Sequence, residues 1–222
     1  MNDKFSLVAP KIGSLLERLH SHADSNDDRI MAQIRDSGVD RSSMNAQEQA
    51  VLLRDASLPV SKEVGRFLYA VVRSIAAKRI VEFGTSFGIS TIYLAAAVRD
   101  GGGGVVIGSE LEESKISKAR QHIYEAGLSD YVDIRQGDAM QTLMRDDGVI
   151  DLLFLDGWKE AYLDLLKVLS GRLRQGSVVL ADDLDIAPDK LKSYLEYVRN
   201  PLNGFVSAML PLGDGMEYSV RL

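Results

Sequence analysis

The spacing of apolar residues changes part-way along this chain, and the first part reads as helical. Residues 1–58 are largely polar, with apolar positions recurring at helical spacing between Ile12 and Ile34. Helix-disfavouring residues gather at Asp24–Asp28 and at Ser37-Gly38, and both sites are predicted as breaks between helices. We therefore predict an N-terminal helical extension over residues 1–58, followed by a second domain over 59–222.

The second part alternates between short apolar runs and longer amphipathic ones. Ser61 is a predicted N-cap for a helix that carries an apolar stripe from Val64 to Ile75. Strand-like runs follow at 79–83, 104–109, 131–136, 150–155 and 177–181, with helical runs near 89–99, 113–126, 139–145, 159–173 and 188–199. This alternation predicts a parallel sheet covered by helices on both faces.

The C-terminal end departs from that alternation. Residues 205–210 and 216–220 are strand-like and flank a turn at residues 211–215 that contains Pro211, Gly213 and Gly215, which predicts an antiparallel hairpin. The predicted fold class is thus α/β and Rossmann-like: a seven-stranded, mostly parallel sheet with an antiparallel C-terminal hairpin, plus the N-terminal helices.

Composition narrows the possible partners. The 222 residues include 26 basic and 32 acidic side chains, a formal charge of −6, with no basic run, so nucleic-acid binding is disfavoured. There is no cysteine, which excludes disulfides and thiolate metal sites. The first ten residues lack the apolar core of a signal peptide, and no apolar stretch approaches the ~18 residues of a membrane span. We predict a cytoplasmic protein without a membrane partner.

The most informative segment is Val81-Glu-Phe-Gly-Thr-Ser-Phe-Gly-Ile-Ser90, which reads as a strand end, a loop and a helix start. Gly84 and Gly88 lack a Cβ, so we expect a ligand to lie against the backbone there. The spacing Glu-x-Gly-x-x-x-Gly differs from the glycine pattern that cradles pyrophosphates. Glu82 would repel a pyrophosphate but suits a cation, and S-adenosylmethionine carries both a sulfonium and an amino group.

Acidic residues also follow the next two predicted strands, at the edge where a doubly wound sheet binds ligands. Glu110 ends the second strand and could accept both hydroxyls of a ribose; the alternative is a solvated loop carboxylate. Asp138 follows the third strand and could accept a hydrogen bond from the adenine amino group. It could equally be a helix N-cap, and the two roles are compatible.

Three further carboxylates follow the fourth and fifth strands. Asp156 ends one, and Asp182-Asp183 ends the other. So many like charges close together would repel one another, and a divalent cation relieves that repulsion. Hard oxygen ligands with open positions suit Mg²⁺. Taken alone, the segment 182–185 is equally consistent with an acidic, solvated turn.

Lys159 lies three residues after Asp156 and is either a solvated surface cation or a general base. Beside a metal ion its ammonium form would be disfavoured, which would let it accept a proton. Trp158 could wall the adenine or the substrate, or belong to the core. His20, His22 and His122 lie on predicted helices away from the strand ends, so we expect them to be solvated and assign them no role.

Several of these segments resemble the catechol O-methyltransferase family. They are residues 81–90, the segment Leu155-Asp-Gly-Trp-Lys-Glu-Ala-Tyr-Leu163, residues 179–183, and Tyr194-Leu-Glu-Tyr-Val-Arg199. The resemblance runs from about Val60 to the C-terminus. It implies a class I methyltransferase fold, S-adenosylmethionine as cofactor, and dependence on Mg²⁺ or another divalent cation.

The resemblance also implies a role for each matching position. Residues lining the methionine end of the cofactor would be Glu82, Gly84, Ser86, Gly88 and Ser90, with Val60 at the mouth of the site, Glu110 on the ribose, and Asp138, Ala139 and Trp158 around the adenine. The metal ligands would be Asp156, Asp182 and Asp183, with Asp156 also facing the cofactor. Lys159 would be the catalytic base.

Three positions depart from the family pattern. The family commonly has Asn where this chain has Asp183, which makes the site here more anionic. Gly157 replaces a histidine of the animal enzymes, which loosens one adenine contact. The tail from Asn200 is shorter, so part of the substrate wall differs and catechol itself is in question as the acceptor.

Together these observations predict an S-adenosylmethionine-dependent O-methyltransferase acting on a small phenolic or vicinal-diol acceptor, as a homodimer. One alternative is a methyltransferase with a different oxygen or nitrogen acceptor. A non-catalytic nucleotide-binding protein is a second alternative. A nicotinamide-dependent oxidoreductase is a third, although the glycine spacing and the C-terminal hairpin argue against it.

Overall fold

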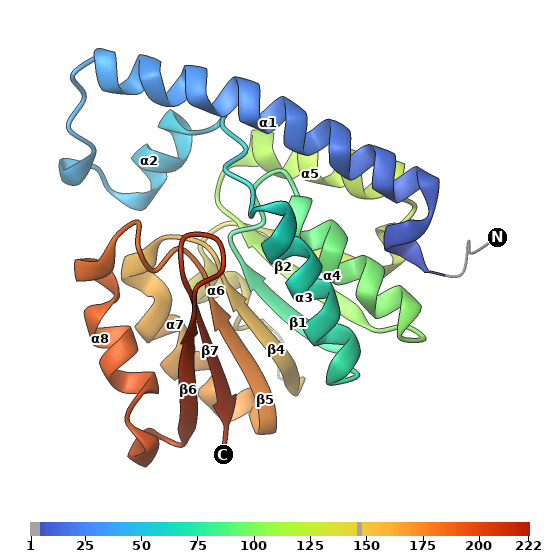
Figure 1. Ribbon diagram of the computed structural model, residues 1–222. Coiled ribbons are helices and arrows are strands. Elements are labelled where there is room, and N and C mark those ends of the chain that lie inside the picture. Colours follow the sequence, from blue (N-terminus) through green and yellow to red (C-terminus); the bar gives the residue numbers. More distant parts are fainter. Residues whose placement is uncertain (1–4, 146–147) are drawn as a thin grey trace.

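A single seven-stranded sheet organises the chain, in a computed structural model that describes residues 5–145 and 148–222. Its strand order is β3-β2-β1-β4-β5-β7-β6 (Figure 1). The strands are β1 (Arg79–Phe83), β2 (Val105–Glu110), β3 (Val132–Gln136), β4 (Ile150–Leu155), β5 (Leu173–Ala181), β6 (Phe205–Leu210) and β7 (Met216–Arg221). The first five are parallel, and β7 runs antiparallel between β5 and β6. The predicted fold class, including the C-terminal hairpin, is confirmed.

Helices cover both faces of the sheet. Those of the described residues are α1 (Pro10–Asp36), α2 (Ala46–Leu52), α3 (Lys62–Ser74), α4 (Ile89–Asp100), α5 (Glu113–Ala126), α6 (Ala139–Thr142), α7 (Tyr162–Leu169) and α8 (Pro188–Val198). Figure 1 shows α1, α3, α4 and α5 on one face and α6, α7 and α8 on the other. The far end of α1 and all of α2 project beyond the edge where the parallel strands end.

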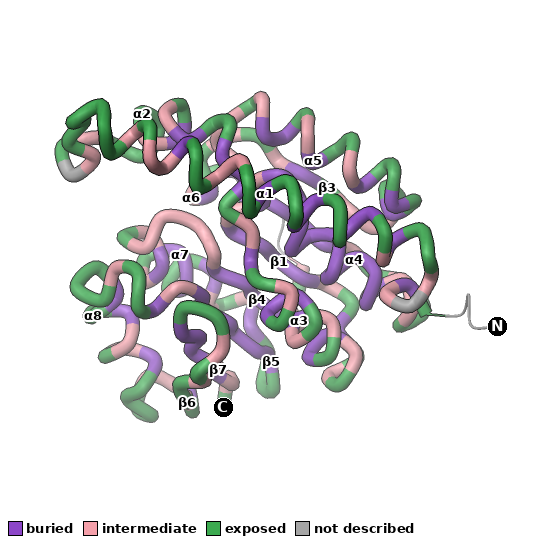
Figure 2. The backbone as a smooth tube through the Cα atoms, turned by 45° about the horizontal axis from the view of Figure 1, so that its top comes forward, coloured by how far each residue is buried: buried purple, intermediate pink, exposed green. Residues whose placement is uncertain are grey.

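The core is divided by the sheet because successive strand residues point to opposite faces. Ile80 belongs to the apolar cluster under α1, α3, α4 and α5, whereas its neighbour Val81 belongs to the cluster under α6, α7 and α8. Figure 2 shows the buried backbone concentrated along the strands and the inward sides of the helices. A third, smaller cluster of Ile30, Leu53 and Ala56 lies within the extension.

The predicted break at Asp24–Asp28 is wrong, because α1 is continuous from Pro10 to Asp36. Polar residues of low helix propensity each cost only about 0.5 kcal/mol in a helix. Burial of Ala23 and Ile30 on the inward side of α1 outweighs that cost. The predicted break at Ser37-Gly38 is where the helix ends.

Two other boundaries also differ from expectation. The helix predicted over 139–145 stops at Thr142. The one predicted over 159–173 is a 3₁₀ turn at Lys159–Ala161, then α7, then a second 3₁₀ turn at Ser170–Arg172, and β5 begins at Leu173 rather than at residue 177. The strand ends that carry the candidate site residues lie within one residue of their predicted positions.

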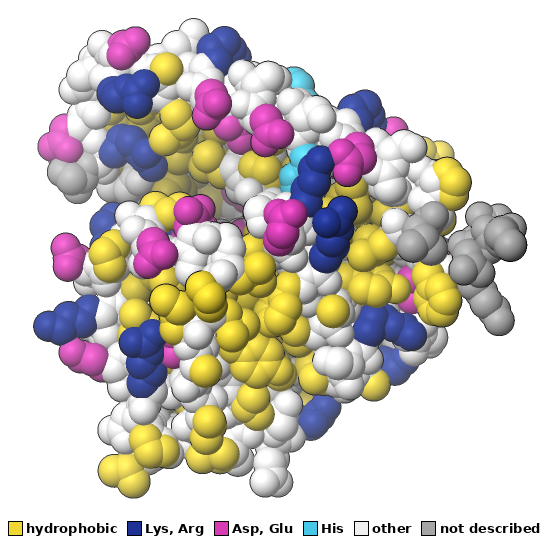
Figure 3. Space-filling model, viewed as in Figure 1, with side chains coloured by type: hydrophobic (Ala, Val, Ile, Leu, Met, Phe, Trp, Pro, Cys, Tyr) yellow, Lys and Arg dark blue, Asp and Glu magenta, His cyan; other side chains and the backbone are white. Residues whose placement is uncertain are grey.

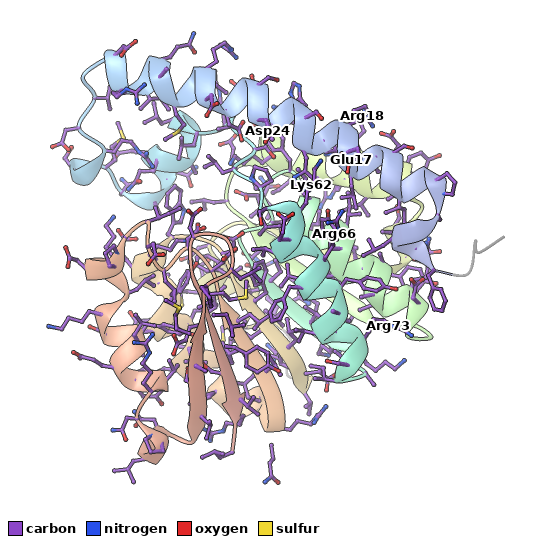
Figure 4. The ribbon with its side chains drawn as sticks, viewed as in Figure 1. Glu17, Arg18, Asp24, Lys62, Arg66 and Arg73 are labelled. Carbon is purple, nitrogen blue, oxygen red and sulfur yellow. The ribbon has the colours of Figure 1, made fainter. Side chains whose placement is uncertain are left out.

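Side chains of α1 form hydrogen bonds with α3 and α4, the helices that it packs against. Lys62 at the start of α3 donates to the Glu17 carboxylate of α1 at 2.5 Å, and Figure 4 shows the two side chains facing each other. His20 of α1 is buried, and its Nε2 lies 3.3 Å from the hydroxyl of Tyr93. The expectation that His20 is solvated is therefore wrong, and burial lowers its pKa.

No helix among the described residues combines the length and hydropathy needed to cross a bilayer.

The C-terminal hairpin is held by an ion pair whose carboxylate is buried. Glu217 of β7 has no exposed surface, and its two carboxylate oxygens accept from Arg199 at 2.8 and 2.6 Å. Ser207 of β6 donates to the same carboxylate at 2.6 Å. The loop at the end of this hairpin contacts the candidate site, since Leu184 N donates to Gly215 O at 3.1 Å.

Arg199→Ala is expected to lower the free energy of unfolding by about 2–3 kcal/mol, because it leaves the buried Glu217 carboxylate without its cation. Urea denaturation followed by circular dichroism measures the change. Arg18→Ala is the matched control: its pair with Glu125 is half-exposed, so the loss there should stay within about 1 kcal/mol. Equal losses in both variants would contradict the idea that burial of the Glu217 carboxylate makes its ion pair more important to stability.

Candidate active site

The carboxyl ends of β1, β2, β3, β4 and β5, with the loops and helix starts that follow them, meet at one edge of the sheet and carry every candidate residue except Val60. This edge faces the projecting part of α1 and α2 (Figure 1). Figure 3 shows the surface hollowed between that projecting part and the α7–α8 part, with apolar side chains on the wall above the hollow. Val60 is buried just before the N-cap of α3, in the large apolar cluster.

Glu82 lies fully buried beneath the loop of residues 84–88, which we call the β1–α4 loop. Its carboxylate accepts from the hydroxyls of Thr85 at 3.0 Å, Ser90 at 2.7 Å and Thr91 at 2.5 Å. Burial raises the pKa of this carboxyl, while the three hydroxyl donors favour its charged form. Glu82 and Ser90 thus contact each other inside the protein and together fix the start of α4.

The two glycines of the β1–α4 loop are also needed for contacts within the protein, and the ligand access expected there stays a prediction. Gly84 has φ +100°, and a Cβ there would overlap the carbonyl oxygen of Asp156. Gly88 has φ +82° and precedes α4, and its Cβ would lie 3.2 Å from that of Ala119. Glycine is therefore favoured at both positions by left-handed backbone and by close packing.

Gly157, the departure from the family pattern, has a steric cause in this chain. A Cβ at this position would come within 2.6 Å of the ring of Phe83, the last residue of β1. A histidine at position 157 would require that ring to move. The Phe83 ring itself packs edge-on against Tyr162.

Glu110 is positioned at the end of β2 by backbone hydrogen bonds. One carboxylate oxygen accepts from Ser86 N at 2.8 Å, and the other accepts from Leu111 N at 2.8 Å and Glu112 N at 2.9 Å. Ser86 itself has φ +47°, an uncommon conformation for a residue with a side chain. The Glu110 carboxylate therefore ties the end of β2 to the β1–α4 loop.

Asp138 and Ala139 begin α6 at the same edge. Asp138 is exposed, and its carboxylate accepts from Met140 N at 2.9 Å, so the N-cap interpretation is confirmed. Ala139 is buried against the sheet. Trp158 is half-buried and packs against two clusters, the one under α6 to α8 and the small one of the extension. The indole thus joins the extension to the loop after β4.

The structure brings Asp156, Asp182 and Asp183 together. Each offers one carboxylate oxygen, and these oxygens lie within 4.8 Å of one another. Asp182 is buried, and its Oδ1 has no hydrogen-bond partner among the described residues. Asp183 has φ +64°, which turns the chain sharply after β5. Such a turn lets two adjacent residues offer oxygens to one point.

Lys159 provides the cation beside these carboxylates. Its Nζ donates to Asp183 Oδ2 at 2.8 Å and to the hydroxyl of Tyr162 at 2.8 Å, and lies 3.7 Å from Asp156 Oδ1. Only 11% of the side chain is exposed. The Tyr162 hydroxyl lies 3.3 Å from the backbone oxygen of Asp182 and donates to it.

The cluster has three carboxyl groups and one ammonium, and burial disfavours the charged forms of the carboxyl groups. The pKa of Asp182 rises to about 7, chiefly through burial and then through the charge of Asp183. Burial also holds the pKa of Asp156 well above its usual value, although Lys159 lowers it. Three carboxylates face one ammonium, so a divalent cation would balance the charge. The oxygen-only donor set and the unpartnered Asp182 Oδ1 fit such an ion.

Sequence reasoning missed three residues that shape this site: Tyr162, Lys115 and Asp27. Tyr162 lies in the segment 155–163 that carries the family resemblance, but neither its spacing nor the resemblance gave it a role. Lys115 is almost fully buried on α5, and its Nζ donates to the Ser86 hydroxyl at 3.1 Å. Neither Lys115 nor Asp27 falls in a recognisable motif, and their contacts are distant in sequence.

The chain is similar to known methyltransferases. A family model described as a methyltransferase domain matches residues 81–184. Catechol O-methyltransferase B of Danio rerio is 35% identical over 154 residues, which cover 66% of this chain and 57% of that protein. Caffeoyl-CoA O-methyltransferase 1 of Eucalyptus globulus is 28% identical over 187 residues, which cover 74% of this chain and 75% of that protein.

Solved structures share the fold of this chain. The crystal structure of cofactor-bound Rv0187 from MTB has a TM-score of 0.69 at 25% identity, over 86% of this chain and 95% of that chain. The present chain spans 57% to 62% of the length of the catechol O-methyltransferases that it matches. The predicted resemblance is confirmed by these matches.

Proposed function

We propose that this chain is one of the S-adenosylmethionine-dependent O-methyltransferases related to catechol O-methyltransferase. In this proposal it methylates a hydroxyl of a small phenolic or vicinal-diol acceptor with the help of a divalent cation. The observation that carries the proposal is the convergence of Asp156, Asp182, Asp183 and Lys159 at one point of the sheet edge. A cation site and an amine side by side suit the removal of a proton from a hydroxyl group.

The three carboxylates would hold the cation, with Mg²⁺ as the expected ion because all the donors are hard oxygens. When bound, a divalent cation lowers the pKa of a coordinated hydroxyl and disfavours the ammonium form of a neighbouring lysine. Asp182 contributes an oxygen with no other partner. Asp183 contributes the carboxylate that also orients Lys159.

Lys159 acts as the general base in this proposal. Asp183 and Tyr162 hold its Nζ between them at 2.8 Å each, so the amine is already positioned. Its nitrogen takes the hydroxyl proton of the acceptor. Bound S-adenosylmethionine would supply the methyl group: the acceptor oxygen would bond to the methyl carbon as the carbon–sulfur bond breaks, leaving a methyl ether and S-adenosylhomocysteine. Alignment of the two reactants can contribute roughly 7–11 kcal/mol to such a displacement.

The cofactor would lie along the same edge, over the β1–α4 loop and between Glu110 and Trp158. Glu110 Oε2 accepts one backbone hydrogen bond, from Ser86 N, so it would keep a lone pair to accept from a ribose hydroxyl. Asp138 and Ala139 would border the adenine. The methionine end would then point toward Asp156, whose carbonyl lies against Gly84.

The test is production of S-adenosylhomocysteine from labelled S-adenosylmethionine with a panel of catechols, including catechol itself, 3,4-dihydroxybenzoate and caffeate, and their monohydroxy counterparts. Turnover is expected with vicinal diols and Mg²⁺, and is expected to stop in EDTA and return on adding Mg²⁺. Full activity in EDTA would refute the metal requirement. A thermal shift with NAD⁺ but not with S-adenosylhomocysteine would instead support the oxidoreductase alternative.

A further inference from the structure

The extension reaches the β1–α4 loop through an unbroken line of hydrogen bonds. Asp27 lies in the long helix α1, and its two carboxylate oxygens accept the backbone N–H groups of Ser57 at 2.9 Å and Leu58 at 2.7 Å. The carbonyl oxygen of Ser57 then accepts from the Ser86 hydroxyl at 2.6 Å. One carboxylate of α1 is thus two hydrogen bonds away from the middle of the β1–α4 loop.

Two residues along this line have a backbone conformation that needs outside support. Leu58 has φ +46° and Ser86 has φ +47°, both in the left-handed region that residues with a side chain rarely adopt. Such conformations persist when surrounding contacts determine them. Asp27 supplies that support at Leu58, because it accepts two successive N–H groups with one rigid, charged group.

Ser86 is held from the opposite side as well. Lys115 of α5 is buried, and its Nζ donates to the Ser86 hydroxyl at 3.1 Å. The backbone N–H of Ser86 donates to Glu110 at 2.8 Å. Ser86 therefore links the β1–α4 loop to one oxygen of Glu110, and these are the two parts of the site that would receive the methionine and ribose ends of the cofactor.

We propose that Asp27 is a positioning residue for cofactor binding: through Ser57 and Ser86, it holds the β1–α4 loop in the form that receives S-adenosylmethionine. The inference rests on the proposed function, since it concerns the same cofactor. It assigns the N-terminal extension a part in forming the cofactor site. Asp27 itself does not touch the cofactor, and its effect passes through the backbone of residues 57–58.

Isothermal titration of S-adenosylhomocysteine into Asp27→Asn tests this role. The asparagine side chain has one oxygen that can accept a hydrogen bond. Its NH₂ group would face the other backbone N–H, and two donors cannot bond to each other. We expect affinity to fall about tenfold, the loss of one charge-assisted hydrogen bond. S-adenosylhomocysteine has no sulfonium charge, so the lost negative charge near the site does not by itself weaken its binding. In turnover, KM for S-adenosylmethionine should rise while KM for the acceptor stays the same.

Asp28→Asn is the matched control, because Asp28 is the adjacent, exposed residue of the same helix and the charge change is identical. Its affinity should stay within about twofold of the wild type. Asp27→Glu keeps the carboxylate and should recover most of the affinity. Equal affinities for Asp27→Asn and Asp28→Asn would overturn the proposal, whereas a wild-type protein that binds no S-adenosylhomocysteine would overturn the proposed function instead.

Ser86→Ala breaks the same line at its other end. If the two residues act through one path, the double variant with Asp27→Asn should bind no more weakly than the weaker single variant. Additive losses would show that Asp27 acts elsewhere. If Asp27→Asn fails to fold by circular dichroism, Ser86→Ala decides alone, since it leaves α1 intact: unchanged affinity for S-adenosylhomocysteine would then overturn the proposal.

Discussion

Lys159→Ala is expected to lower kcat by about 10²–10⁴-fold, the usual contribution of a positioned general base. Affinity for S-adenosylhomocysteine should change by no more than about twofold, because Lys159 contacts Asp156, Asp183 and Tyr162 rather than the β1–α4 loop. Initial rates at saturating S-adenosylmethionine, combined with calorimetric titration, measure the two quantities separately. Parallel losses in turnover and in cofactor affinity would contradict the role of base.

Lys159→Arg tests whether residue 159 acts as a base or only as a positive charge. Arginine keeps a cation beside Asp183 but cannot give up its proton in a protein. It should therefore be about as inactive as the alanine variant. Substantial activity in Lys159→Arg would show that position 159 needs only a positive charge. Lys190→Ala is the control, since Lys190 is an exposed lysine that pairs with Glu160 on the surface, and its removal should leave kcat unchanged.

The site could be predicted to the extent that it depends on where strands end. Asp156, Asp182 and Glu110 each come at or directly after the end of an apolar strand, and parallel strands bring their carboxyl ends to one edge. The sequence therefore indicated which carboxylates would meet. It did not indicate which groups would donate to the carboxylates of this edge: the N–H of Ser86 on Glu110 and the hydroxyls on Glu82 come from the folding of the β1–α4 loop and the start of α4.

Contacts between residues far apart along the chain could not be predicted from a single sequence. Asp27 is 30 residues from Ser57 and 31 from Leu58, and the segment 24–28 read as a helix break because its residues have low helix propensity. Tertiary packing of Ala23 and Ile30 reversed that preference. The predicted division at residue 58 likewise rests on sequence pattern alone, whereas Trp158 packs against Ile30, Leu53 and Ala56 across it.

Asp182→Asn is expected to abolish metal-dependent turnover and, in the absence of metal, to raise the melting temperature above pH 7. Burial and Asp183 raise the pKa of Asp182 to about 7 in the folded protein, whereas an unfolded aspartate has a pKa of about 3.9. The protonated carboxyl is favoured by folding, so its contribution to stability is complete below about pH 4 and is lost as the pH rises through 7.

An uncharged amide at position 182 avoids that loss, because it stays neutral at every pH and its NH₂ can donate to the neighbouring carboxylates. The melting temperature of Asp182→Asn should therefore exceed that of the wild type in EDTA at pH 8 by a few degrees, and the difference should shrink toward pH 5. Mg²⁺ should raise the melting temperature of the wild type at pH 8 but not that of the variant, because ligand binding stabilises only the form that binds it. Scanning calorimetry over this pH range measures both effects. A variant that melts below the wild type in EDTA at pH 8 would show that the carboxylate of Asp182 stabilises the fold, so that the cluster is a structural feature rather than a site kept for a cation.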